Sequence, residues 1–168
     1  MIDFIVLRQP TRKQRILSPV WGRAIWEFNL DEFSGPAIVI EAQRLSPIVW
    51  PRSLNTQQTR ELERLRKDGH TVHRTRCGIE IRTTHSSLRT TVLYRTLLHE
   101  LGHHVDYQRW SVDEWRCKAH TEKEDFAHRY AQEIYMELSM RMLLPFPSIL
   151  IDESLQADSL HREWFSLS

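Results

Sequence analysis

Cysteine is scarce in this sequence. Only Cys77 and Cys117 occur among 168 residues, so the chain could form one internal disulfide at most. A small secreted domain that depends on disulfides for its stability usually contains more cysteines. The scarcity therefore argues against a disulfide-rich scaffold, and we expect an intracellular protein whose thiols are reduced.

Long apolar stretches are also missing. No run approaches the roughly 20 apolar residues that a membrane-spanning helix requires. The apolar stretch at residues 2–7 contains Asp3 and turns polar at Arg8, which makes it too short and too acidic for a signal peptide. We therefore predict a cytoplasmic protein with no membrane partner.

Charge of one sign does not prevail either. Lysine and arginine number 23, aspartate and glutamate number 22, and the formal net charge is +1. A protein that binds nucleic acid or an anionic membrane usually carries a marked basic excess. The charge balance thus gives no reason to expect a nucleic-acid partner.

What the sequence contains is sufficient for one folded domain. A chain of 168 residues with 40% hydrophobic residues can bury a core of useful size, and we expect a single domain over residues 1–168. Residues 1–53 form a strand-rich N-terminal part in this interpretation, because short apolar runs alternate there with proline-containing turns. The strands are expected at residues 2–7, 21–28 and 37–43.

Helices are expected in the remainder of the chain. The first is short and mostly solvated, and the second begins at Ser86 or Ser87, either of which can cap a helix. A loop is expected at residues 111–119. Strands that precede the helices, rather than alternate with them, predict an α+β domain. The expected helices cover residues 56–67, 87–105, 120–144 and 152–165.

One strand is expected directly before the second helix. After the turn at Gly78, Ile79 and Ile81 alternate with Glu80 and Arg82. Alternation of apolar and polar residues is typical of a strand with one buried face. The pattern therefore predicts a half-buried strand from residue 79 onward.

The most informative stretch is His-Glu-Leu-Gly-His at residues 99–103. On a helix, His99 and His103 project from one face, one turn apart, and two such imidazoles can share a zinc ion at about 2.0–2.1 Å. Glu100 is turned about 100° around the helix, so it can take a proton from a zinc-bound water without binding the metal. Gly102 lowers helix stability by roughly 1 kcal/mol relative to alanine, which suggests close packing there.

A His-Glu-x-x-His pattern is only moderately specific. The alternative interpretation is a solvated helix face that happens to carry two histidines. Apolar residues recur at helical spacing through this region, at Leu98, Leu101 and Val105. Such a stripe buries the helix next to the histidines and favours the metal site.

Zinc in a catalytic site needs a third protein ligand and one open position. Glu124 lies one turn before Ala127 in the next expected helix, at the edge of its apolar stripe. A carboxylate that points toward a core needs a partner, so Glu124 is the candidate ligand. His120, one turn earlier on the same helix face, is its rival.

Two segments together resemble a known family. His-Glu-Leu-Gly-His-His-Val-Asp at residues 99–106, followed by Glu-Asp-Phe-Ala-His-Arg-Tyr-Ala at residues 124–131, is similar to the gluzincin zinc peptidases. The similarity is greater still to the catalytic domain of anthrax lethal factor and to the minigluzincins. It implies one zinc ion per chain, with Glu124 as the third ligand, in a core at residues 78–144.

The resemblance also carries expectations for the fold and the substrate. It implies a small mixed or antiparallel sheet packed on the motif helix and on the glutamate helix. It further implies that the strand at residues 78–82 is an edge strand at the rim of the cleft. An extended peptide or protein substrate would pair with that edge by β-augmentation.

The sequence departs from the family pattern in two respects. His128 stands where relatives often place an acid one turn after the glutamate ligand, and Asp106 or Asp125 is the alternative residue for orienting a ligand histidine. No tyrosine lies between Tyr107 and Glu124, where some relatives keep a residue that stabilises the oxyanion. The candidates for that role are His120, His128 and Tyr130.

A zinc-dependent endopeptidase is the function that these residues favour. The alternative is a zinc-stabilised regulatory or protein-binding module with little turnover, although structural zinc would not need a general base such as Glu100. A deformylase-like amidase would use an upstream cysteine ligand, and the sequence around Cys77 does not support one. The longer metzincin pattern is excluded, because Asp106 and Arg109 replace its glycine and third histidine. Substrate specificity and oligomeric state are left open.

Overall fold

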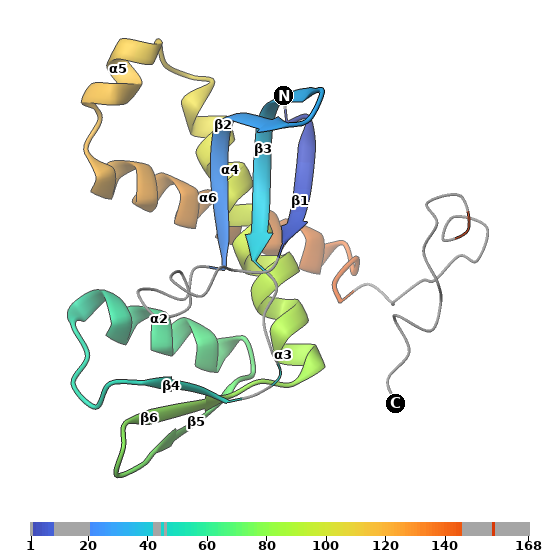
Figure 1. Cartoon of the computed structure of the whole chain (residues 1–168). Helices are drawn as coiled ribbons and strands as arrows, with labels where there is room; N and C mark the ends of the chain where they lie inside the picture. Colours follow the sequence, from blue (N-terminus) through green and yellow to red (C-terminus); the bar gives the residue numbers. More distant parts are fainter. Residues whose placement is uncertain (1, 9–20, 42–44, 46, 146–155, 157–168) are drawn as a thin grey trace. The chain divides into compact units, whose positions relative to one another are not determined.

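The computed structural model describes residues 2–8, 21–41, 45, 47–145 and 156. Contacts within the chain define two compact units, Met1–Met136 and Glu137–Ser168. The first unit is α+β, as the order of elements predicts, and it contains both sheets (Figure 1). The helix expected at residues 152–165 falls almost wholly outside the described residues. None of the described helices is long and apolar enough to cross a membrane.

The first sheet is mixed and is built from the N-terminal strands. Its strands are β1 (Phe4–Arg8), β2 (Gly22–Leu30) and β3 (Phe33–Glu41), in the order β1-β3-β2. The central strand β3 pairs parallel with β1 and antiparallel with β2. Its residues from Ala37 to Ile40 are all buried, as expected for a strand covered on both faces. The three strands predicted in this region are confirmed.

The second sheet is antiparallel and packs on a helix. Its strands are β4 (Ile48–Trp50), β5 (Thr71–Arg74) and β6 (Ile79–Arg82). Helix α2 (Thr56–Lys67) has the predicted bounds and begins at a capping box between Asn55 and Gln58. The predicted alternation in β6 is confirmed, because Ile79 and Ile81 are buried. The core cluster between sheet and helix contains Trp21, Trp50, Leu62, Leu65, Ile79 and Ile81.

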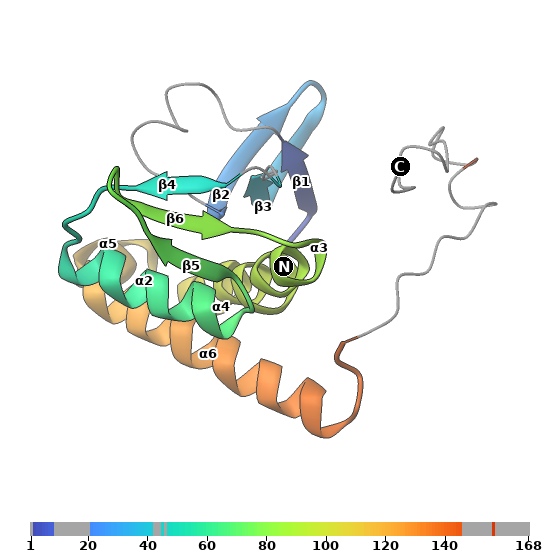
Figure 2. The ribbon, with the colours of Figure 1, turned by 90° about the horizontal axis from the view of Figure 1, so that it is seen from below.

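The prediction that Gly78–Arg82 form a free edge strand is wrong. Strand β6 is the central strand of the order β4-β6-β5 (Figure 2). Its Ile79–Ile81 segment pairs with β4 on one side, and Ile79–Arg82 pairs with β5 on the other. A strand with a partner on each side has no unpaired backbone edge to offer a peptide. The edges of this sheet belong to β4 and β5.

The motif helix is not one continuous α-helix. Helix α3 (His85–Arg89) is capped by Thr84, two or three positions before the serines predicted for this role. A π-helical turn, η1 (Thr90–Thr96), then leads into α4 (Leu97–Tyr107), and the Leu97 amide donates to the Val92 carbonyl five residues back. The β-branched threonines and valine of this turn have a weaker α-helical preference than leucine or alanine. The histidine motif therefore lies at the start of α4, directly after the π-helical turn.

Two further helices follow α4. The loop predicted at residues 111–119 is instead largely a short helix, α5 (Val112–Cys117), capped by Ser111. Helix α6 (His120–Met140) begins where it is predicted to begin and ends before Pro145. Cys77 and Cys117 are both free and exposed, so neither forms a disulfide.

Candidate metal centre

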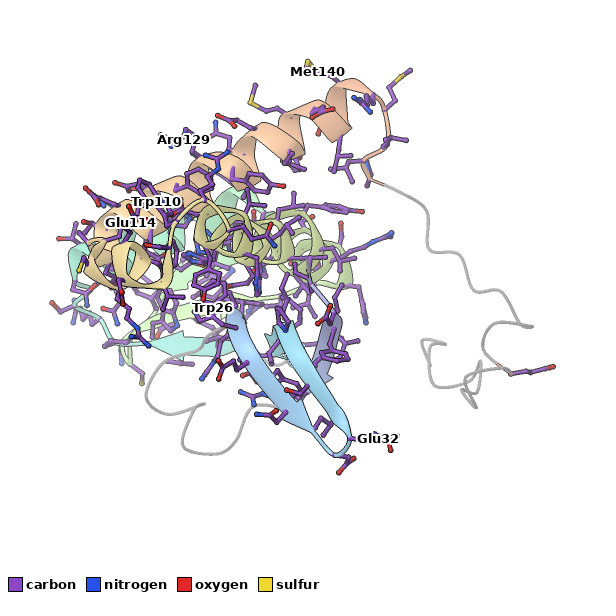
Figure 3. The ribbon with its side chains drawn as sticks, turned by 90° about the horizontal axis from the view of Figure 1, so that it is seen from above. Trp26, Glu32, Trp110, Glu114, Arg129 and Met140 are labelled. Carbon is purple, nitrogen blue, oxygen red and sulfur yellow. The ribbon has the colours of Figure 1, made fainter. Side chains whose placement is uncertain are left out.

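The sheet fixes the rotation of α4. This helix packs against β2 and β3, and the buried His104 donates from Nε2 to the carbonyl oxygen of Ala37 over 3.0 Å. Trp26 on β2 is labelled in Figure 3. Its ring meets the His104 ring edge-on, with ring centres 4.6 Å apart. Because adjacent helix residues are turned by about 100°, His103 then points to the side of the face that His104 turns toward the sheet.

Gly102 brings α6 close to α4. A Cβ atom at this position would lie 3.0 Å from the Cα of Ala127, 3.1 Å from its carbonyl oxygen and 3.2 Å from the Cβ of Tyr130. Only a residue without a side chain fits this approach without displacing backbone. The close packing predicted for Gly102 is confirmed, and it places the residues one turn on either side of Ala127 beside the motif.

Glu124 lies between the two motif histidines. Its Oε2 atom is 3.4 Å from Nε2 of His99, and its Oε1 atom is 3.3 Å from Nε2 of His103. The two imidazoles are nearly buried, with side chains 14% and 12% exposed. His120 is 3.8 Å from Glu124, but its side chain is 81% exposed, so it approaches the cluster only from the solvent side.

These separations fit a tetrahedral metal ion. Ligand atoms at about 2.0–2.1 Å from zinc lie about 3.3–3.4 Å from one another in ideal tetrahedral geometry. The His99–Glu124 and His103–Glu124 distances of 3.4 and 3.3 Å are of this size, and each runs to a different oxygen of the carboxylate. Two imidazoles and a carboxylate are also a donor set that zinc prefers. In the described part of the chain, the group whose ligand atoms all lie within 4.8 Å of one another is His99, Glu124 and His128, and it could hold a metal ion. His103 is not in that group, although its Nε2 atom is 3.3 Å from Glu124.

The electrostatics of Glu124 suit a ligand. Hydrogen bonding with His103 and with His99 holds the pKa of the Glu124 carboxyl well below its usual range, although burial opposes the shift. The carboxylate is therefore ionised at neutral pH. An ionised carboxylate between two histidine nitrogens has lone pairs available for a divalent cation.

His128 extends the cluster. Ligand atoms of His99, Glu124 and His128 all lie within 4.8 Å of one another, and the ring centres of His99 and His128 are 4.3 Å apart. Burial lowers the pKa of His128 to about 3, so its imidazole is neutral. Sequence reasoning placed His128 among the candidate oxyanion stabilisers, whereas the structure places it in a group that could hold a metal ion.

Glu100 lies against the first sheet. Its side chain is buried and accepts a hydrogen bond from the backbone of Ala24 on β2. Burial raises the pKa of Glu100, while the two neighbouring histidines oppose this. A Cβ at Gly22 would lie 3.0 Å from the Glu100 Cγ atom and 2.6 Å from the Thr96 Cγ2 atom. Strand β2 therefore confines the Glu100 carboxylate. No local sequence pattern predicts this contact between β2 and α4.

Asp106 does not orient a ligand histidine. One of its carboxylate oxygens accepts from the indole nitrogen of Trp110 at 3.1 Å, and the other binds the Lys118 ammonium. Asp106 itself is buried. The suggestion that it supports His99 or His103 finds no support in these contacts, because its two oxygens bind Trp110 and Lys118.

The oxyanion stabiliser stays a prediction. The Tyr130 ring stacks on Phe126, with ring centres 6.3 Å apart, and His120 is largely exposed. A cavity of about 340 Å³ lies elsewhere in the structure and shares no residue with the histidine cluster. That cavity is lined by Arg52, Arg74, Thr75, Arg76, Gly78 and Ile79.

Comparison with known proteins yields no match to this chain. This holds for protein-family models, for curated proteins and for solved structures. The function is therefore proposed from the residues of the site and their geometry.

Proposed function

We propose that this protein is a zinc-dependent endopeptidase whose metal is held by His99, His103 and Glu124. The observation that carries the proposal is the position of Glu124, 3.4 and 3.3 Å from the two motif histidines. Two imidazoles and a carboxylate that converge in this way offer the nitrogen and oxygen donors that zinc prefers. The donor set supports zinc rather than calcium or magnesium, which prefer oxygen ligands.

Glu100 is the proposed general base. When bound, zinc lowers the pKa of a water molecule and polarises a carbonyl oxygen. Glu100 is next to the first histidine but directed toward β2, where Ala24 and Gly22 confine it. Its carboxylate accepts the proton of the attacking water and delivers it to the leaving amine. A general base of this kind distinguishes a hydrolase from a site in which zinc is purely structural.

The edge of β2 is the proposed place of the substrate. Strand β2 is at one end of the order β1-β3-β2, and Ala24 in this strand donates a backbone hydrogen bond to Glu100. A peptide that paired with this edge would run beside the general base. The substrate-pairing role that the sequence suggested for Gly78–Arg82 is thus moved to β2.

The alternative function is a zinc-stabilised regulatory or protein-binding module. It shares the metal ligands with the peptidase but does not need Glu100. Cleavage of peptides by the zinc-loaded protein is therefore the measurement that separates the two.

Metal analysis of purified variants tests the ligand set. We expect one zinc per chain in the wild type, loss of zinc in Glu124→Ala, and retention in Glu100→Ala. Glu122→Ala is the matched control, because Glu122 is an exposed glutamate two residues before Glu124 on α6. Zinc retained by Glu124→Ala but lost from His120→Ala would overturn the proposed ligand set.

Cleavage of a mixed peptide library tests the reaction. We expect the zinc-loaded wild type to cleave peptides, and Glu100→Ala to lose this activity while keeping its zinc. Glu122→Ala should cleave like the wild type. If the zinc-loaded wild type left the library intact, the binding module would become the better interpretation.

A further inference from the structure

We propose that His128 is a fourth protein ligand of the same metal ion, which fills the remaining coordination position in the resting protein. This inference rests on the proposed function, because His99, His103 and Glu124 are taken as the other three ligands. It adds a form of regulation: His128 must leave the metal before water or a substrate carbonyl can bind there.

The position of His128 on α6 supports this role. It follows Glu124 by one helical turn, so both side chains emerge from the same helix face. Ligand atoms of His99, Glu124 and His128 lie within 4.8 Å of one another. The Gly102–Ala127 contact, one residue before His128, holds this part of α6 close to the motif helix.

A different role for His128, as a hydrogen-bond partner of His99, agrees less well with the geometry. The buried Nδ1 atom of His99 has no hydrogen-bond partner in the described part of the chain. An in-plane N–H···N bond between two imidazoles would place their centres about 5 Å apart. The observed separation is 4.3 Å, with the ring planes inclined by 37°. The two rings are therefore too close together for an in-plane hydrogen bond between their nitrogen atoms.

Two imidazoles on one zinc ion have centres about 4.5–5.2 Å apart, for angles between 90° and the tetrahedral value at the metal. The His99 and His103 rings, at 4.7 Å, fall within this range. The His99 and His128 rings, at 4.3 Å, are about 0.2 Å short of it. To bind the same ion, the His128 ring would therefore have to move outward from His99.

The exchange at the metal is simple in chemical terms. A neutral imidazole leaves and a neutral water or carbonyl oxygen takes its place, so neither the charge nor the oxidation state changes. Catalytic zinc sites normally have three protein ligands and an open position, whereas closed four-ligand sites are typical of structural zinc. His128 would thus switch one site between these two states.

X-ray absorption spectroscopy of the zinc-loaded protein tests the proposal by counting imidazoles. We expect three in the wild type, two in His128→Ala and two in His128→Gln, which preserves more of the packing if the alanine variant fails to fold. His120→Ala is the control and should keep three. Two imidazoles in the wild type and still two in His128→Gln would overturn the fourth ligand while leaving the proposed function intact. A wild type that binds no zinc would overturn both.

A second measurement reports on the open position directly. Replacement of zinc by Co²⁺ makes the binding of azide visible in the absorption spectrum. Because azide must displace His128 in the wild type, we expect at least roughly tenfold tighter azide binding in His128→Gln. Equal azide affinity in the two proteins would show that the position is already open and would overturn the proposal.

Discussion

Asp106 illustrates how a residue close in sequence to the proposed metal ligands can serve the fold instead. Its carboxylate binds the Lys118 ammonium, and the two side chains are 2% and 15% exposed. The same ammonium lies 5.1 Å from the Trp110 ring centre and 5.6 Å from that of Trp115. A pair so enclosed depends on both of its members, because either one alone is a buried charge without a partner.

We expect Asp106→Asn to reduce the free energy of unfolding by about 2–4 kcal/mol, because the Lys118 charge would lose its counter-charge in a largely buried place. The zinc content should stay at one per chain, since Asp106 contacts no proposed ligand. Urea unfolding and metal analysis measure the two effects.

Asp113→Asn is the control for this experiment. Asp113 pairs with Arg116 at the surface, where its side chain is 94% exposed, so its replacement should leave the unfolding curve unchanged. Loss of zinc from Asp106→Asn without loss of stability would contradict the structural role and return Asp106 to the metal site.

At the scale of elements, the crossing of α4 and α6 assembles the site. Glu124 and His128 both lie on α6 within one turn of Ala127, which touches Gly102 on α4. The distance between the two helices at this point determines whether Glu124 can reach His99 and His103. A glycine that is unfavourable in an isolated helix is thus required by packing.

We therefore expect Gly102→Ala to weaken zinc binding and to lower the free energy of unfolding by about 1–3 kcal/mol. The added methyl would meet the backbone of Ala127 at 3.0 and 3.1 Å, which outweighs the gain of about 1 kcal/mol in helix propensity. Zinc titration against a competing chelator and urea unfolding measure these changes. Gln132→Ala, at an exposed position of α6, is the control. Tighter zinc binding in Gly102→Ala would contradict this prediction, because it would show that α4 and α6 can move apart at Gly102 without loss of the site.

Local patterns predicted the elements that have strong periodicity. The histidine pair, the helix of Glu124 and the buried face of β6 all follow from residue spacing alone, and the structure places these residues as spacing suggests. The neighbours of β6 could not be predicted in this way. Strand β4 has only three residues, too few for an alternating pattern, yet its pairing removes the free edge of β6.

The parts of the site that the sequence did not reveal depend on tertiary contacts. Gly22 confines Glu100 from another element, and nothing in the strand sequence marks that contact. His128 was visible as a histidine on the correct helix, but its approach to His99 depends on the crossing at Gly102. Residue type and spacing can propose ligands, whereas the packing of helices decides which of them meet.

At the scale of the whole first unit, a buried polar network joins the second sheet to the motif helix. His70, just before β5, is 2.8 Å from the hydroxyl of Thr91 in η1. That hydroxyl donates to Asp68, which also accepts from Arg95. Because the Thr91 proton is directed to Asp68, Nε2 of His70 is the donor toward Thr91. The network thus anchors the π-helical turn that precedes the histidine motif.

The lowered pKa of His70 makes the free energy of unfolding depend on pH. Burial lowers the pKa of His70 below its ordinary value of 6.5, so between that lowered pKa and about 6.5 the unfolded chain binds a proton that the folded chain does not. The free energy of unfolding should therefore fall as the pH decreases from 7.5 to 5.5. Urea unfolding of the metal-free protein at both pH values should show a smaller fall in His70→Gln than in the wild type. His73→Gln, at an exposed position of β5, should retain the wild-type difference. An unchanged difference in His70→Gln would mean that other buried histidines, such as His104, account for the acid sensitivity.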